Sequence, residues 1–272
     1  MRGSVLIVAL WTLEFMAFLA VVMSLHAGFR IQAAARLTRR ISSHQAAWGA
    51  AEEAIASLLK QKEKGEGFTS GEGFTLVEEN GKISLNAAPA GTLSALLAQF
   101  TDPSNAEEIA AAAVDWREKN GSLESVEELL LVEGMDSDLF FLVRDSVTVF
   151  GNGKVNLNAA GPAILKGMGF SSSLANKLLL YRKGPGPDES FGTPDDGRFS
   201  SVGTFPAELN QGQPLSKEEL AEASALAGSG LFTAESDLFE LNVRKGNPGE
   251  PGFRAFRFLV NLEGAIQQWR EE

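Results

Sequence analysis

The chain has 272 residues, no cysteine and a formal net charge of −11, from 24 basic and 35 acidic side chains. The absence of cysteine excludes disulfides and thiolate metal ligands. An acidic surface repels phosphate backbones, so we expect no nucleic-acid partner. The two histidines, His26 and His44, both lie in the N-terminal 62 residues. A histidine-dependent triad or a His/Cys metal centre in the rest of the chain is therefore excluded.

Residues 1–62 predict one long helix. The apolar run over residues 4–25 is long enough to cross a bilayer core, which needs about 20 residues. Apolar or small residues then recur at the spacing of one helix face, at Ala33, Leu37, Ile41, Ala47, Ala51, Ile55 and Leu58. We expect a helix over residues 4–62, about 88 Å long at about 1.5 Å per residue. Residues 4–25 would be a transmembrane anchor, and residues 26–85 the stem and the first strands.

The start of the chain has a distinctive order, in which Arg2 and Gly3 precede an uninterrupted apolar helix from Ser4. This order resembles that of type IV pilin and pseudopilin precursors. The resemblance implies that residues 1–3 are a leader, cut after Gly3 by a prepilin peptidase, and that Ser4 becomes the methylated N-terminus. Most members of these families carry glutamate at the fifth mature residue, where this chain has Val8.

The apolar run contains one acidic residue and is followed by several arginines. Glu14 lies inside the run, where a carboxylate is costly. It either faces another helix of an assembly or is protonated, or it pairs with the N-terminus of a partner. Four arginines follow the run, and the positive-inside rule would place that side in the cytoplasm. The pilin resemblance implies the opposite orientation, with the C-terminal part in the periplasm. The arginines are Arg30, Arg36, Arg39 and Arg40.

A duplication organises the rest of the chain. Residues 81–88 recur as residues 153–160, and residues 121–129 recur more loosely as residues 197–205. Helical segments 107–117 and 173–182 lie between these blocks, and each ends in an aromatic residue and arginine. Asn86 and Asn158 suit the N-cap of a following helix. Ser125 and Ser201 are further caps, and Glu128 completes a capping box with Ser125.

Strand-like segments frame these helices. We expect one hairpin from residues 74–77 and 82–85, and a second from residues 147–150 and 154–157. Strands at 238–243 and 253–262 flank a loop rich in glycine and proline at 246–252. The predicted fold is α+β, with a long N-terminal helix on a small antiparallel sheet. A helical insertion over residues 86–235, with repeats at about 81–150 and 153–235, interrupts it, and residues 236–272 complete the sheet.

The second repeat resembles helix-hairpin-helix and SAM-like modules, with Gly167 and Gly169 at the hairpin. Such glycines either let backbone amides approach a DNA phosphate or only form a tight turn.

The missing glutamate and the duplicated insertion together resemble the general secretion pathway protein K family, the minor pseudopilin that caps the type II secretion pseudopilus. The resemblance implies a structural role in protein export and a single-pass inner-membrane location. It also implies a prepilin peptidase and other minor pseudopilins as partners. The pseudopilins would bind the helix stem, in part at alanine-rich faces such as 33–35 and 46–47, with Val8 and Glu14 as further helix-packing positions. Alternatives are a membrane-anchored DNA-binding protein like the competence receptors, and a type IV pilus minor pilin.

Candidate chemistry is confined to one acidic loop at residues 184–197. Flexible loops with several oxygen donors can hold calcium, and related pseudopilins bind this ion. The candidate ligands are Asp188, Glu189, Asp195 and Asp196. Asp115 before Trp116 is similar to an Asp-Trp pair of the family, but no further acidic run follows it. We find no catalytic motif and expect no enzyme.

Overall fold

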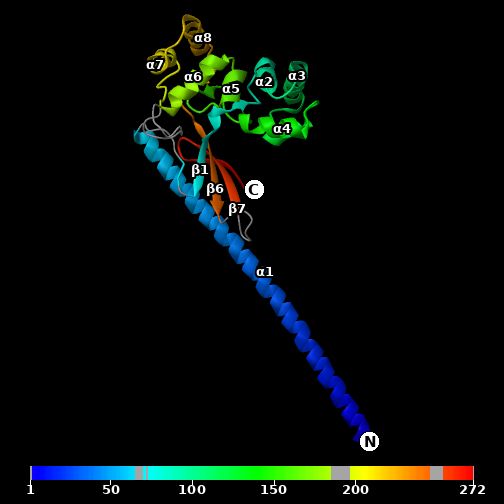
Figure 1. Ribbon diagram of the computed structural model, residues 1–272. Helices are drawn as coiled ribbons and strands as arrows, with labels where there is room; N and C mark the ends of the chain where they lie inside the picture. The colour runs from blue at the N-terminus through cyan, green and yellow to red at the C-terminus, as the bar shows by residue number, and fades with distance from the viewer. Residues whose placement is uncertain (1, 65–69, 72, 185–196, 246–253, 272) are drawn as a thin grey trace.

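A computed structural model describes residues 2–64, 70–71, 73–184, 197–245 and 254–271, with only the backbone given for residues 2–8, 64, 245 and 254. One long helix carries a small sheet near its C-terminal end, and a helical head lies beyond the sheet (Figure 1). The N-terminus is at the far end of the helix from the head (Figure 1). The expected α+β architecture is confirmed.

Helix α1 (Arg2–Lys64) is continuous, as its periodicity predicts. Its side chains are exposed from residue 9 to residue 42, apart from a half-buried Gly28. Further along, alanines at Ala47, Ala51 and Ala54 are fully or almost fully buried against the sheet. Small side chains at these positions let the helix and the sheet approach closely. The helix therefore has a free N-terminal part and a packed C-terminal part.

The sheet has four antiparallel strands in the order β1-β6-β7-β8. These are β1 (Phe74–Glu78), β6 (Leu238–Lys245), β7 (Arg254–Asn261) and β8 (Ile266–Glu271). Apolar side chains cover the face toward α1, namely Phe74, Leu241, Val243, Phe256, Phe258 and Val260. The two strands expected at 238–243 and 253–262 are present as β6 and β7, whereas β8 was not predicted. Strands β1 and β6 are neighbours in the sheet, so the head is inserted in the sequence between two paired strands.

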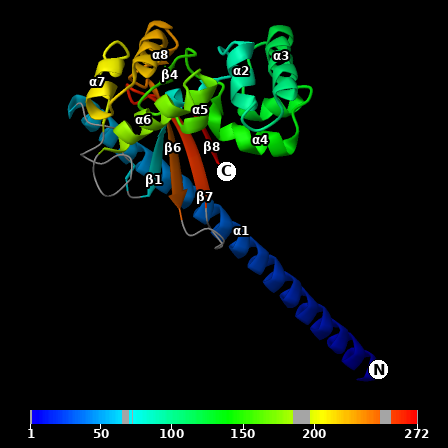
Figure 2. The same ribbon diagram turned by 45° about the horizontal axis from the view of Figure 1, so that its top comes forward.

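The head consists of two helical units that share one apolar core. The first unit, residues 83–149, contains β2 (Ile83–Ser84), α2 (Ala90–Leu97), α3 (Pro103–Asn120), the 3₁₀ helix η2 (Val126–Leu131), α4 (Ser137–Val143), the 3₁₀ helix η3 (Arg144–Ser146) and β3 (Val147–Thr148). The second unit, residues 155–234, contains β4 (Val155–Asn156), α5 (Pro162–Gly167), α6 (Ser172–Lys183), α7 (Phe205–Gly212), α8 (Lys217–Gly228) and β5 (Phe232–Thr233). Figure 2 shows α2, α3 and α4 on one side of α5, and α6, α7 and α8 on the other.

Each unit is closed by a short parallel pair of strands. In the first unit β2 pairs with β3, and in the second β4 pairs with β5. Both predicted hairpins are therefore wrong. The segment between β1 and β2 is a 3₁₀ turn, η1 (Glu79–Gly81), that sends the chain from the sheet into the head. Strand β3 returns to the start of its own unit, and β4 begins the next unit.

The two repeat asparagines hold equivalent loops and are not N-caps. Asn86 donates from Nδ2 to the carbonyls of Leu123 and Val149, and its Oδ1 accepts the Leu123 N–H. Asn158 makes the same three bonds with Phe199 and Ala234. The following helices begin only after Pro89 and Gly161, which excludes the predicted capping role. Equivalent bonds in both units confirm the duplication.

The serine cap predicted at Ser125 is confirmed, and the one predicted at Ser201 is wrong. Ser125 and Glu128 form a capping box at η2, with the Glu128 carboxylate accepting the Ser125 N–H at 3.1 Å. Ser201 is not the cap of α7, because Thr204 is its N-cap residue; Ser201 accepts the Thr204 N–H at 3.2 Å in the turn before the helix. The capping box satisfies N–H groups at the start of η2 that have no partner within the helix.

The repeated Gly-Lys motifs pack the two units against each other reciprocally. A Cβ built on Gly81 would lie 2.8 Å from the Cβ of Ala159, and one on Gly153 would lie 2.6 Å from that of Ala87. The glycine of each copy thus contacts the alanine of the other. Only glycine fits such a close approach, so the interface between the units explains why both copies carry this motif.

Replacement of Asn158 distinguishes the loop-holding role from capping. Asn158→Ala leaves three backbone groups without their partner, and we expect a loss of about 2–4 kcal/mol in urea unfolding. Asn158→Asp is a good N-cap but has no amide donors, so we expect it to be similarly destabilised. Asn120→Ala is the control, because its amide donates only to the Trp116 carbonyl of the same helix, at the exposed end of α3. Full stability of Asn158→Asp would contradict this assignment.

Candidate functional site

The most unusual surface of the molecule is the free part of α1. Large apolar side chains are exposed all around it, at Leu10, Trp11, Leu13, Phe15, Met16, Phe18, Leu19, Val21, Val22, Met23, Leu25, Phe29, Ile31, Leu37 and Ile41. Over residues 9–29 these side chains cover every face of the helix, and a helix of this kind requires a membrane or other protein around it. Arg30, Arg36, Arg39 and Arg40 follow on the rest of the free part. By length and composition, α1 could cross a membrane. The part from residue 9 to residue 42 extends roughly 50 Å at about 1.5 Å per residue.

Gly3, Ser4, Val8 and Glu14, which were predicted for processing and helix packing, all lie in the N-terminal part of α1, before the residues that the sheet covers. Gly3, Ser4 and Val8 belong to its first turns, where only the backbone is described. Glu14 is exposed among apolar side chains, and no described residue forms an ion pair with it. No residue that the structure describes therefore compensates its charge.

The two alanine-rich faces predicted for partner contact differ in how exposed they are. Ala33, Ala34 and Ala35 are exposed and available to a neighbour. Ala47 is 0% exposed, because the sheet of its own chain covers it, and Ala46 is half-buried. The expectation that Ala47 contacts another subunit is therefore wrong, and the free surface ends where the sheet begins.

A buried polar junction fixes the head to the sheet. The Glu78 carboxylate at the end of β1 accepts from Asn156 at 2.7 Å and from Ser236 at 2.6 Å. Asn156 also donates to the Ser236 hydroxyl at 2.8 Å. The Asn80 side chain accepts the N–H groups of Asp237 and Leu238 at the start of β6. The junction thus joins β1, β4 and β6 where the chain enters and leaves the head.

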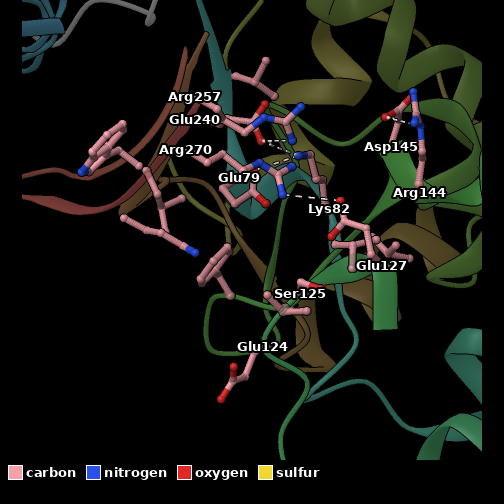
Figure 3. Close-up of a pocket in the computed structure, with 18 of the residues that line it drawn as sticks. Glu79, Lys82, Glu124, Ser125, Glu127, Arg144, Asp145, Glu240, Arg257 and Arg270 are labelled. Atoms are coloured by element: carbon pink, nitrogen blue, oxygen red, sulfur yellow. Dashed lines mark hydrogen bonds and ion pairs between the residues drawn. The ribbon is translucent and has the colours of Figure 1, made fainter. Parts of the chain in front are cut away.

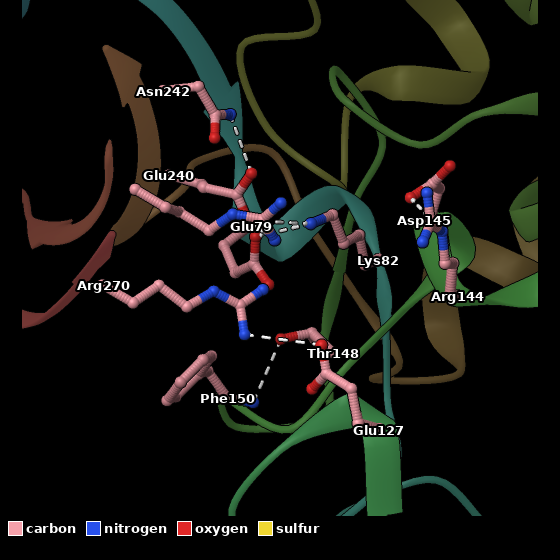
Figure 4. A network of polar contacts seen from close by, with 11 residues as sticks. Glu79, Lys82, Glu127, Arg144, Asp145, Thr148, Phe150, Glu240, Asn242 and Arg270 are labelled. Atoms are coloured by element: carbon pink, nitrogen blue, oxygen red, sulfur yellow. Dashed lines mark hydrogen bonds and ion pairs between the residues drawn. The ribbon is translucent and has the colours of Figure 1, made fainter. Parts of the chain in front are cut away.

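Beside this junction, a cleft of about 540 Å³ lies between the first unit and the sheet face turned away from α1 (Figure 3). Its walls carry an ion-pair network (Figure 4). Lys82 lies 2.8 Å from Glu79 and 3.6 Å from Glu240, and Arg257 lies 3.4 Å from Glu240. Burial raises the pKa of Glu240, but the charge of Lys82, a bond from Asn242 and the charge of Arg257 outweigh it and lower the pKa. These groups neutralise each other and hold β6, β7 and η1 together.

One ion pair crosses the cleft from the head to the sheet. Arg270 on β8 lies 3.4 Å from Glu127 on η2, and both side chains are about half exposed. Burial raises the pKa of Glu127, but its own backbone N–H, Arg270 and Ser125 together lower it. Sequence reasoning missed the cleft entirely, because its residues come from segments far apart in the chain.

The remaining candidates do not form a described site. Gly167 ends α5, and a Cβ there would lie 3.1 Å from the Leu96 Cβ, so this glycine serves the contact between the units. Gly169 has φ of +95° in the turn before α6. Asp115 forms an exposed ion pair with Lys119 at 2.6 Å. Among the described residues there is no cluster of metal-ligating side chains. The four predicted calcium ligands, Asp188, Glu189, Asp195 and Asp196, lie outside the described residues.

Substitution of two α1 alanines separates the packed from the free part of the helix. Ala47→Leu overfills the contact with the sheet, and we expect a loss of about 1–3 kcal/mol in denaturant unfolding. Ala34→Leu, on the exposed part, should change stability by less than about 0.5 kcal/mol. Equal effects of the two substitutions would show that the sheet does not cover α1 at Ala47.

Comparisons with known proteins address the fold. No protein-family model matches the chain, and no curated protein sequence matches it. A solved structure does: a chain in the crystal structure of the GspK-GspI-GspJ complex from the enterotoxigenic Escherichia coli type 2 secretion system. The TM-score is 0.57 at 15% identity, over 86% of this chain and 99% of that chain. At this identity the likeness shows the fold alone, so the chain has the fold of a component of that complex along most of its length.

Proposed function

We propose that the chain is a minor pseudopilin of a type II secretion system and caps the tip of its pseudopilus. The observation that carries the proposal is the division of α1. Its C-terminal part is buried under its own sheet, and its N-terminal part exposes apolar side chains on all sides. Such a helix suits a subunit that is first held in a membrane and then packed among the helices of its neighbours.

In this role, residues 1–3 are the leader and residues 4–25 span the inner membrane. Residues 26–85 form the stem and first strands, residues 86–235 the helical insertion, and residues 236–272 the closing strands of the pilin domain. The head then lies in the periplasm. Other minor pseudopilins would contact the exposed face at Ala33, Ala34 and Ala35, and a prepilin peptidase would remove the leader.

Two features support a place at the tip. Val8 stands where most pilins carry the glutamate that pairs with a neighbour's N-terminus, and a subunit with no neighbour above it has no need of that pair. The head also extends the molecule beyond the sheet, at the end opposite the N-terminus (Figure 1). A further subunit could not stack there without displacing the head.

Glu14 fits the same role. Its carboxylate is exposed on the apolar part of α1, and burying it in hydrocarbon without a partner is costly. In an assembled pseudopilus it faces a neighbouring helix, where it is protonated or pairs with the amino terminus of another subunit. The first arrangement tolerates glutamine at this position, and the second does not.

Analysis of the mature N-terminus tests the proposal. Expressed with an active prepilin peptidase, the chain should lose residues 1–3 and begin at N-methylated Ser4, as measured by mass spectrometry. Gly3→Ala should block cleavage, because the resemblance places the cut after glycine. The control Gly28→Ala, at a position with open space around it, should be processed normally. An intact Met1 beside a peptidase that cuts other pilins would contradict the proposal.

A further inference from the structure

The first helical unit carries most of the negative charge of the chain. Residues 83–149 contain twelve acidic and three basic side chains, which gives a formal net charge of −9 against −11 for the whole chain. Seven of the acidic side chains lie within residues 124–145, the part of the unit that includes η2 and α4, and Arg144 is the one basic residue there. This part of the head is therefore strongly acidic.

Ion pairs compensate little of this charge. Glu127 pairs with Arg270, and Asp145 pairs with Arg144. The other five acidic side chains form no ion pair with any residue that the structure describes, and these are Glu124, Glu128, Glu133, Asp136 and Asp138. Five negative charges therefore lie within residues 124–138 without a basic partner, and together they attract positively charged groups.

The same part of the head exposes large apolar side chains. They are Leu130 and Leu131 on η2, and Phe141 and Leu142 on α4, which packs against η2. Leu131 is 68% exposed and Phe141 is 60% exposed. Single exposed apolar residues are common on protein surfaces, but several on two packed elements with a polar rim are typical of an interaction site.

Phe141 is held in place although most of it is exposed. Its ring contacts the ring of buried Phe140 edge-on, with a centroid distance of 5.8 Å. The guanidinium carbon of Arg144 lies 5.0 Å from the centroid of the Phe141 ring. The ring thus already attracts one basic side chain of its own chain, through the cation–π interaction that aromatic faces offer to arginine and lysine.

We propose that this surface is a docking face for a segment of a different, neighbouring protein chain that carries both apolar and basic side chains. The docking face consists of Leu130, Leu131, Glu133, Asp138, Phe141 and Leu142. Apolar side chains of the segment cover the two leucines of η2 and the Phe141 ring, and its lysines or arginines pair with Glu133 and Asp138. Nucleic acids and anionic lipids are repelled by the uncompensated carboxylates, so the charge of the face selects a protein partner.

The position of the docking face suits a neighbour that stands beside the helix stem. In both views of the chain, α4 lies below α2 and α3, on the side of the first unit turned toward the N-terminal end of α1 (Figures 1 and 2). A chain that packs alongside the free part of α1 would meet the head at α4. The docking face thus deepens the proposed function, on which it rests, by adding a contact surface on the head to the one on the stem.

Peptide binding to the full chain in phosphatidylcholine nanodiscs tests the docking face. The probe is a labelled helical peptide of about fourteen residues, with leucines on one side and arginines on the other, and its binding to empty nanodiscs is subtracted. Glu133→Gln together with Asp138→Asn should weaken binding about fivefold, the size of two exposed ion pairs. Leu131→Ala should weaken it about fourfold, the contribution of roughly one buried methylene group.

Matched variants outside the docking face are the controls. Glu108→Gln together with Glu118→Gln removes the same charge from exposed positions of α3, and Leu180→Ala shortens an exposed leucine of α6. Each control should change binding by less than about twofold, because salt screens charges that the peptide does not contact. Equal weakening by the two pairs of carboxylate variants would show only a general attraction to an acidic chain, and would overturn the docking face. An unchanged affinity of Leu131→Ala would overturn it as well.

A second copy of the chain as the occupant gives a different result. The full chain would then associate without any peptide, as measured by light scattering of the nanodiscs, and Phe141→Ser would abolish the association. That outcome would overturn the assignment to a different neighbour, and we expect no such association. The binding assay needs neither peptidase nor secretion system. Its failure would therefore leave the proposed function intact, and failed leader cleavage would leave the peptide result interpretable.

Discussion

The antiparallel pairing of β1 with β6 is the constraint on which the rest of the structure depends. Residues 79–237 separate the two strands in sequence, so this pairing brings both ends of the head together at one end of the sheet. The bonds among Glu78, Asn156 and Ser236 then satisfy the polar groups buried there. A buried polar group without a partner is costly, so this junction favours one position of the head over others.

This constraint divides α1 into a part that packs on the sheet and a part that stays exposed. The sheet closed by β1 and β6 presents one apolar face, and only the alanine-rich part of α1 fits closely against it. No other part of the chain that the structure describes covers the preceding apolar turns. The charged face of the same sheet forms one wall of the cleft under the first unit, and its edge strand β8 carries Trp269 and Arg270. The packing of the sheet thus leaves three surfaces exposed, namely the apolar part of α1, the cleft and the edge strand.

The sequence predicted what depends on local periodicity and repetition. The length of α1, the strands β6 and β7 and the duplicated unit were all anticipated, since helical spacing and recurring blocks are visible in a single chain. Strand pairing was not. The segments 82–85 and 154–157 follow turn-like residues and suggest hairpins, yet each pairs with a strand more than 60 residues away. No local signal encodes a parallel pairing of two residues.

The roles of two kinds of residue, the repeat asparagines and Ala47, were predicted wrongly for related reasons. Asparagine suits an N-cap and a loop-holding bond equally well, and only the position of Leu123 and Phe199 distinguishes these roles. Ala47 and Ala34 look alike in a helical pattern, and the sheet that covers one of them is formed by residues about 30 to more than 200 positions further along. Trp269 and Arg270 lie in a strand that was not predicted, so their surface could not be recognised.

Burial of the stem by neighbouring subunits is tested most directly by measuring how accessible the stem is before and after assembly. The natural absence of cysteine allows single-cysteine variants, Leu37→Cys on the free part of α1 and Glu108→Cys on the exposed surface of the head. Labelling with a membrane-impermeant maleimide would be compared in cells that express the chain alone or with a complete secretion system. We predict that the secretion system protects residue 37 and leaves residue 108 reactive. Equal labelling of residue 37 in both cells would contradict burial of the stem by neighbouring subunits.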